Sequence, residues 1–255
     1  MDSIFLNNET FTFEVCANSV ESCIAAQQAG AHRVELCASI PEGGTTPSLG
    51  EITIARQRLH DTRLHVIIRP RGGDFLYSDL ELERMIFDIE TCRKEGVDGV
   101  VFGCLTAEGE IDMEKNKMLM ACARGMSVTF HRAFDRCLFP LKALEQLASL
   151  GFDRILTSGQ QPTAIQGVAL LAQLHQAAHG KIHIMAGCGV NEHNIRSIYE
   201  ATGIHEYHFS ARERIASRMR FQSTDVRMGN ADVDESTILQ TTPTRVRQVI
   251  ASLHQ

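Results

Sequence analysis

The chain lacks several features that would assign it to a specialised class of protein. It contains no tryptophan and six prolines in 255 residues, and no apolar run approaches the roughly 20 residues that a membrane span needs. Its formal net charge of -6 and pI of about 6.0 provide no basic surface for nucleic acid or an anionic membrane. The first ten residues match neither a secretory signal nor a transit peptide. We therefore expect a soluble, cytoplasmic protein without nucleic-acid or membrane partners.

The cysteines also lack a recognisable arrangement. Eight are present, but none forms a C-x-x-C pair, and there is no methionine-rich copper motif. They are scattered over expected helices and strands, which in a reducing compartment indicates free thiols. We expect most of them to fill the core.

What the chain does contain is one pattern repeated eight times. Strand-like runs alternate with segments of helical apolar spacing, and Ser48 with Glu51 and Ser78 with Glu81 predict capping boxes at two helix starts. Eight such units on about 250 residues favour a single (β/α)8 barrel of the TIM type over a doubly wound sheet. The eight runs are TFEVCA, RVELCA, RLHVIIRP, GVVFGCL, SVTFHRA, RILTSG, KIHIMAG and EYHFSA.

We expect one α/β domain over residues 1–255, with the first strand at about 11–16 and the last at about 206–210. Residues 211–242 are too long for an ordinary connection and predict an extended irregular loop, followed by a closing C-terminal helix at PTRVRQVIASL. Long ordered loops at a barrel mouth are often functional, although a flexible insertion is the alternative.

The period of two along a strand indicates which side chains enter the barrel. In the first strand Phe11, Phe13 and Val15 share the face toward the helices, so Glu14 and Cys16 point inward. The same rule turns Arg33, Glu35 and Cys37 inward, as well as Arg69, His131, His208 and Ser210. Because consecutive barrel strands are neighbours, we expect Glu14 beside Glu35 and Cys16 beside Cys37, near the carboxyl ends where barrel active sites lie.

Two buried carboxylates side by side need compensation. Arg69 on the next strand is the natural partner, because its planar guanidinium can bridge Glu14 and Glu35. One interpretation is a salt-bridge network that merely fills the barrel. The other is chemistry, because barrel interiors are normally filled with branched apolar side chains.

Two glycine-bearing turns follow the sixth and seventh strands, where barrels commonly bind phosphate. Small residues also form such turns without a ligand, so both readings stay open. Arg71 lies on the loop after the third strand, beside Gly72 and Gly73. The expected anion-binding residues are Arg71, Ser158, Gly159, Gly187, Gly189 and Ser210.

Six motifs together resemble the CutC family, which is named for copper homeostasis. They are EVCANSVES, RVELCASIPEGGTTPSLG, IIRPRGGDFLYSD, TFHRAFD, RILTSGQ and HFSAR, and they cover nearly the whole chain from about Phe13. The resemblance implies a (β/α)8 barrel, a cytoplasmic location, a homodimer or higher oligomer, and an association with copper tolerance.

Two functional hypotheses follow. In the first, Cys16 and Cys37 bind Cu(I), for which thiolates are suitable soft ligands, with His208 as a third ligand from across the mouth. In the second, the protein is an enzyme acting on a small anionic metabolite, a phosphate or a carboxylate. Glu14 or Glu35 would then be the acid or base and His131 its complement, while Arg69 and the glycine turns hold the anion.

Overall fold

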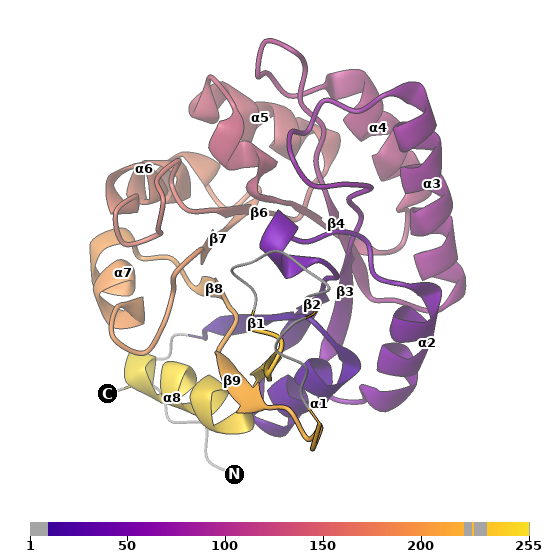
Figure 1. Ribbon diagram of the computed structural model, residues 1–255. Coiled ribbons are helices and arrows are strands. Elements are labelled where there is room, and N and C mark those ends of the chain that lie inside the picture. Colours follow the sequence, from indigo (N-terminus) through magenta and orange to yellow (C-terminus); the bar gives the residue numbers. More distant parts are fainter. Residues whose placement is uncertain (1–9, 222–225, 227–233, 255) are drawn as a thin grey trace.

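The computed structural model describes residues 10–221, 226 and 234–254. Eight parallel strands form a closed barrel in which each strand pairs with the next along the chain and β8 closes on β1 (Figure 1). The expected (β/α)8 barrel is therefore confirmed. The strands are β1 (Thr12–Ala17), β2 (Arg33–Leu36), β3 (Arg63–Ile67), β4 (Gly99–Phe102), β5 (Ser127–Phe130), β6 (Arg154–Thr157), β7 (His183–Gly187) and β8 (Glu206–Phe209).

Helices surround the strands and cover their apolar outer faces (Figure 1). Outward-pointing Phe13, Val15, Val34 and Leu36 are buried between strands and helices, as the alternation predicted. The helices are α1 (Val20–Gln28), α2 (Leu49–Arg58), α3 (Asp79–Lys94), α4 (Met113–Cys122), α5 (Pro140–Leu150), α6 (Val168–Ala178), α7 (Ile195–Thr202) and α8 (Pro243–His254), with short 3-10 helices at Ile40–Glu42 and Arg132–Arg136.

Of the two predicted capping boxes, one is complete and the other forms its serine hydrogen bond. Ser78 and Glu81 form a complete capping box at α3, and the Ser48 hydroxyl accepts a hydrogen bond from the Glu51 N–H at α2. None of the helices that the structure describes is both long and apolar enough to cross a bilayer.

The segment after β8 differs from the irregular loop that we expected. Its described ends pair as an antiparallel ribbon, β9 (Arg212–Ala216) with β10 (Thr237–Thr241). The ribbon is attached to the barrel rim, because the Thr241 N–H donates to the Ser22 hydroxyl at 3.1 Å and the Asn18 amide donates to the Leu239 carbonyl at 2.7 Å. Residues 222–225 and 227–233 of the predicted loop lie outside the described residues. The closing helix is confirmed as α8.

Candidate functional site

The two Glu-x-Cys sequences are offset by two residues in the barrel. Glu14 lies opposite Arg33, and Cys16 lies opposite Glu35. We expected Glu14 beside Glu35 and Cys16 beside Cys37, and the side chains of both pairs do approach to within 4.8 Å. The backbone register differs from a level pairing, because the strands of a closed barrel are staggered along its axis. Cys37 follows β2 and donates its backbone N–H to the Ala17 carbonyl at 2.9 Å. The stagger leaves Glu14 deeper in the barrel than Glu35.

Arginine does balance the deep carboxylates, but it is not Arg69. Arg33 forms an ion pair with Glu14 and a second with Glu206, whose Oε2 lies 2.9 Å from Nη2. Arg154 reaches the same Glu206 oxygen at 3.1 Å. The predicted contact of Arg69 with Glu14 and Glu35 is therefore wrong, because a nearer guanidinium on β2 fills that position.

His208 connects the deep ion pairs to the barrel mouth. Its Nδ1 lies 2.7 Å from Glu14 Oε1, and its Nε2 lies 3.6 Å from Glu35 Oε2. Burial raises the pKa of Glu14, but the charges of Arg33 and His208 reverse this and hold the pKa well below its usual range. Burial lowers the pKa of His208, yet contacts with Cys16 and Glu14 outweigh it and leave the pKa well above the ordinary value.

Glu35 is the acid that reaches the mouth. Its side chain is buried, and Oε1 has no hydrogen-bond partner among the described residues. Burial raises the pKa of Glu35 to about 8, against the opposing charge of His208. This carboxyl group is therefore protonated at neutral pH and ionises just above it.

Two thiols lie beside Glu35. The sulfur atoms of Cys16 and Cys37 and one Glu35 carboxylate oxygen all lie within 4.8 Å of one another. A hydrogen bond between the thiols lowers the pKa of Cys16 well below its ordinary value and raises that of Cys37 well above it, and burial adds to the rise at Cys37. Of the two thiols, Cys16 is therefore the more readily ionised.

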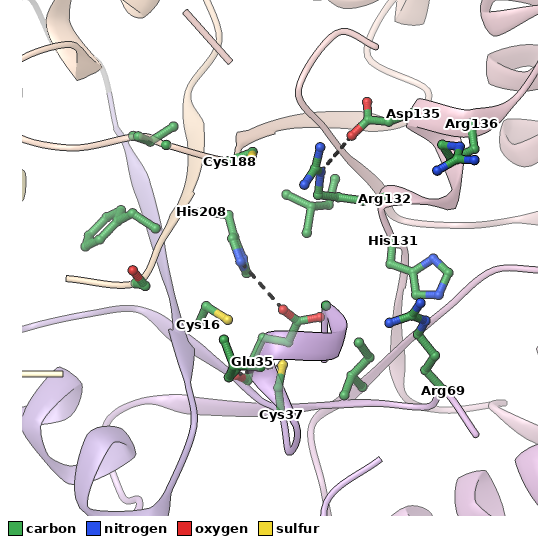
Figure 2. A pocket seen from close by; sticks show the side chains of 18 of the residues that line it. Cys16, Glu35, Cys37, Arg69, His131, Arg132, Asp135, Arg136, Cys188 and His208 are labelled. Carbon is green, nitrogen blue, oxygen red and sulfur yellow. Dashed lines mark hydrogen bonds and ion pairs between the residues drawn. The ribbon is translucent and has the colours of Figure 1, made fainter. Parts of the chain in front are cut away.

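These groups line a cavity of about 470 Å³ at the carboxyl ends of the strands. Figure 2 shows Cys16 and His208 on one side of it and Arg69 and His131 on the other, with Arg132 and Arg136 beside His131. Of the residues predicted from sequence, the cavity is lined by Cys16, Glu35, Cys37, Arg69, His131, Gly189, His208 and Ser210. Glu14 lies beneath the floor, so it supports His208 and does not face the cavity.

Arg69 and His131 both lie at the cavity wall, and both are buried. The Arg69 guanidinium donates to the carbonyls of Glu42, Gly44 and Gly73, each at 2.9 Å. His131 accepts the Ala133 N–H on Nδ1 at 3.3 Å. Burial, with the Arg69 charge adding to it, lowers the pKa of His131 to about 3, so the ring is neutral.

Several of the expected anion-binding residues already have other partners. The Ser158 and Gln160 N–H groups both donate to Asp135 Oδ1, at 3.0 and 3.1 Å, so an internal carboxylate occupies the turn that contains Gly159. An external anion would have to displace Asp135.

Arg71 and Gly187 likewise have structural neighbours. The Arg71 guanidinium bonds to Glu81 at 2.6 Å and to Asp74 at 2.9 Å, which closes the loop after β3. Gly187 is packed so closely against Leu156 and His208 that a Cβ atom there would clash with Leu156. Neither residue lines the cavity.

Comparison with known proteins identifies the family. The sequence model of the CutC family matches residues 11–213. This chain belongs to the CutC family.

Relatives of this CutC protein span nearly its full length. A family protein CutC from Bacteroides thetaiotaomicron is 60% identical over 95% of this chain and 98% of the relative. The human copper homeostasis protein cutC homolog is 46% identical over 94% and 88% of the two chains. The solved structure of CutC from Streptococcus agalactiae has 37% identity and a TM-score of 0.76, covering 79% of this chain and 99% of the other.

A thiamine phosphate pyrophosphorylase from Pyrococcus furiosus is 15% identical, with a TM-score of 0.59 over 95% of each chain, and shares the fold alone.

Sequence reasoning missed part of the polar interior of this CutC barrel. Arg154 and Glu206 begin β6 and β8 and join Arg33 in a buried chain of ion pairs. The alternation placed Arg33 on the inner face, and because it also turned His208 inward it places Glu206, two residues earlier, on the same face. Which of these inward residues would form ion pairs was not predictable, because the stagger between strands decides which side chains lie at the same height along the barrel axis.

Proposed function

We propose that this CutC protein binds Cu(I) at the barrel mouth through Cys16 and Cys37. The observation that carries the proposal is the approach of the two sulfur atoms and a Glu35 oxygen to within 4.8 Å of one another. Thiolates are soft ligands, and Cu(I) prefers them over carboxylates and water. The donor set therefore fits the metal that the family name suggests.

His208 could contribute a further ligand to this site through its Nε2 atom, because its other ring nitrogen is held by Glu14. Its Nδ1 is held by Glu14 at 2.7 Å, a carboxylate–histidine contact of the kind that orients metal ligands. Its Nε2 faces Glu35 on the side of the thiols. We infer that His208 is the third ligand, and that Glu14 and Arg33 fix its ring.

The proposal is tested by titrating the purified protein with Cu(I) against a competing chelator. Cys16→Ser and Cys37→Ser should each lose at least about 100-fold in affinity, because losing a metal ligand costs more than losing a residue that only orients one. Cys188→Ser is the matched control, since Cys188 also lines the cavity but lies outside the cluster. Unchanged affinity in both cluster variants would exclude the site.

A second candidate is an enzyme that acts on a small anionic metabolite, and Glu35 favours it. A carboxyl group with a pKa of about 8 and an unpartnered oxygen at a cavity is suited to general acid or base catalysis. In this reading Glu35 transfers the proton, His131 is its complement and Arg69 anchors the substrate. Glu14 acts by orienting His208.

We also propose a cytoplasmic location and a homodimer. All eight cysteines are free, as expected for a reducing compartment.

The dimer is supported by an exposed apolar face of α3. Leu80 and Phe87 are each 68% exposed and lie seven residues apart on this face, which suits contact with a second copy. Sedimentation should show a dimer for the wild type and a monomer for Phe87→Glu. A wild type that stays monomeric at all concentrations would contradict the dimer.

A further inference from the structure

Arg69 differs from the other two arginines buried inside the barrel. Arg33 and Arg154 each pair with a carboxylate, whereas no carboxylate oxygen in the described part of the chain lies within 4.0 Å of Arg69. Its hydrogen-bond acceptors are three backbone carbonyls, and its Nε has no partner among the residues that the structure describes. Carbonyl dipoles hold the guanidinium in place, but no carboxylate of the described residues lies within ion-pair distance to neutralise its charge.

His131 adds a second free donor on the same wall. Because Nδ1 accepts from the Ala133 N–H, the neutral ring carries its proton on Nε2. That nitrogen is buried and has no partner among the described residues. Phe75 lies against both groups, with its ring 5.0 Å from the Arg69 guanidinium carbon and 4.9 Å from the His131 ring. Arg69 and His131 therefore bring one cation and one neutral N–H donor, each with a buried nitrogen that lacks a partner among the described residues, to the same wall of the cavity.

The rest of the mouth has the same sign of charge. Four arginines line the cavity, against two acids, and Asp135 is already paired with Arg132 at 2.8 Å. Arg136 and Arg212 form no ion pair with any residue that the structure describes. A small anion entering the cavity would thus meet positive charge at the rim and at the Arg69 wall.

We propose that Arg69 and His131 bind the anionic group, phosphate or carboxylate, of a small organic acid at the mouth of this barrel. A cavity of about 470 Å³ is in the range of small-metabolite sites. The site stands apart from the copper proposal, because it uses none of the copper ligands. It would supply the substrate anchor that the enzyme candidate requires.

The experiment uses the full-length protein with copper removed by a chelator. Inorganic phosphate and succinate are titrated separately at constant ionic strength, with sodium chloride as the reference, and binding is followed by calorimetry. The His131 Nε2–H resonance is followed by NMR in the same samples. We expect saturable binding of at least one anion and a downfield shift of that resonance as the donor gains an acceptor.

His131→Phe keeps an aromatic ring against Phe75 and removes the donor, so it should weaken binding by about tenfold or more. Arg136→Gln and Arg212→Gln, which change rim residues, should weaken it less. Arg69→Met should abolish anion binding. If that variant fails to fold, the anion affinity of His131→Phe tests the proposal by itself. Cys37→Ser should lose copper and keep anion binding, which separates the two proposals.

Two results would overturn the inference. One is a response to both anions that equals the response to chloride. The other is saturable binding that is unchanged in His131→Phe, because the anion would then lie elsewhere.

Discussion

Arg33 contacts two buried carboxylates at once and is itself 4% exposed. Replacing it with methionine keeps much of the side-chain volume but leaves Glu14 and Glu206 without that cation. We expect Arg33→Met to lower the free energy of unfolding by about 3 to 5 kcal/mol, because unpaired buried charges are costly. Urea melts followed by circular dichroism measure the loss.

Arg196→Met is the matched control for this experiment. Arg196 pairs with Glu200 at 2.9 Å one helical turn away, with both side chains about half exposed, so its removal should cost less than about 1 kcal/mol. Similar losses for the two variants would mean that the interior ion pairs are solvated.

Glu35 should remain protonated through neutral pH. Its burial favours the uncharged acid and raises its pKa to about 8. In protein labelled with 13C at glutamate, the Glu35 carboxyl resonance, assigned by its absence from Glu35→Gln, should titrate near pH 8. A midpoint below about pH 6 would remove the main support for Glu35 as an acid or base.

The inner faces of individual strands could be predicted from sequence, whereas contacts between strands could not. Alternation correctly turned Glu14, Arg33 and Glu35 inward. The prediction that Arg69 is their partner was wrong, because it assumed that equivalent residues on adjacent strands lie at the same height along the barrel axis. The two-residue offset between β1 and β2 brings Arg33 to Glu14 instead.

At the scale of elements, the β6–α6 loop depends on an internal anion. Besides the two backbone N–H groups, Asp135 accepts the Thr157 hydroxyl at 2.5 Å. Glycine in this turn was a correct sign of an anion nest, but the anion belongs to the 3-10 helix after β5. The local sequence RILTSGQ could not predict that the bound carboxylate comes from a residue more than 20 positions earlier in the chain.

We therefore predict that Asp135→Ala loosens this loop. The variant should lose about 2 to 4 kcal/mol of stability, because hydrogen bonds to a charged acceptor are strong and their donors would be left buried. Hydrogen exchange should become faster at the Ser158 and Gln160 amides. Asp74→Ala is the control, since Asp74 is exposed and closes a different loop. Unchanged exchange at these amides would show that the nest does not need the carboxylate.

For the whole molecule, the buried ionisable groups make the free energy of unfolding depend on pH, and two sets of groups act in opposite directions. His65 and His131 have pKa values lowered to about 3, mainly by burial, so the unfolded chain binds more protons below about pH 6.5. Stability should fall as the pH drops through that window, and faster once the lowered pKa of Glu14 adds its effect. Glu35 and His208 have raised pKa values and act the other way, because Glu35 lowers stability as the pH rises from about 4.5 to 8 and His208 lowers it above about 6.5. Together these groups predict maximal stability near pH 6.

His131→Phe isolates one part of the acid slope. In the unfolded wild type, the histidine takes up a proton between pH 6.5 and 4, whereas burial keeps the ring neutral in the folded wild type. Phenylalanine takes up no proton in either state. Between pH 7 and pH 4 the wild type should therefore lose about 3 kcal/mol more than the variant does. Urea melts of both proteins at the two pH values give the difference, which cancels whatever the substitution costs in packing. Parallel losses would mean that His131 is hydrated or paired in the folded protein, and the free donor at the cavity wall would have to be assigned to another group.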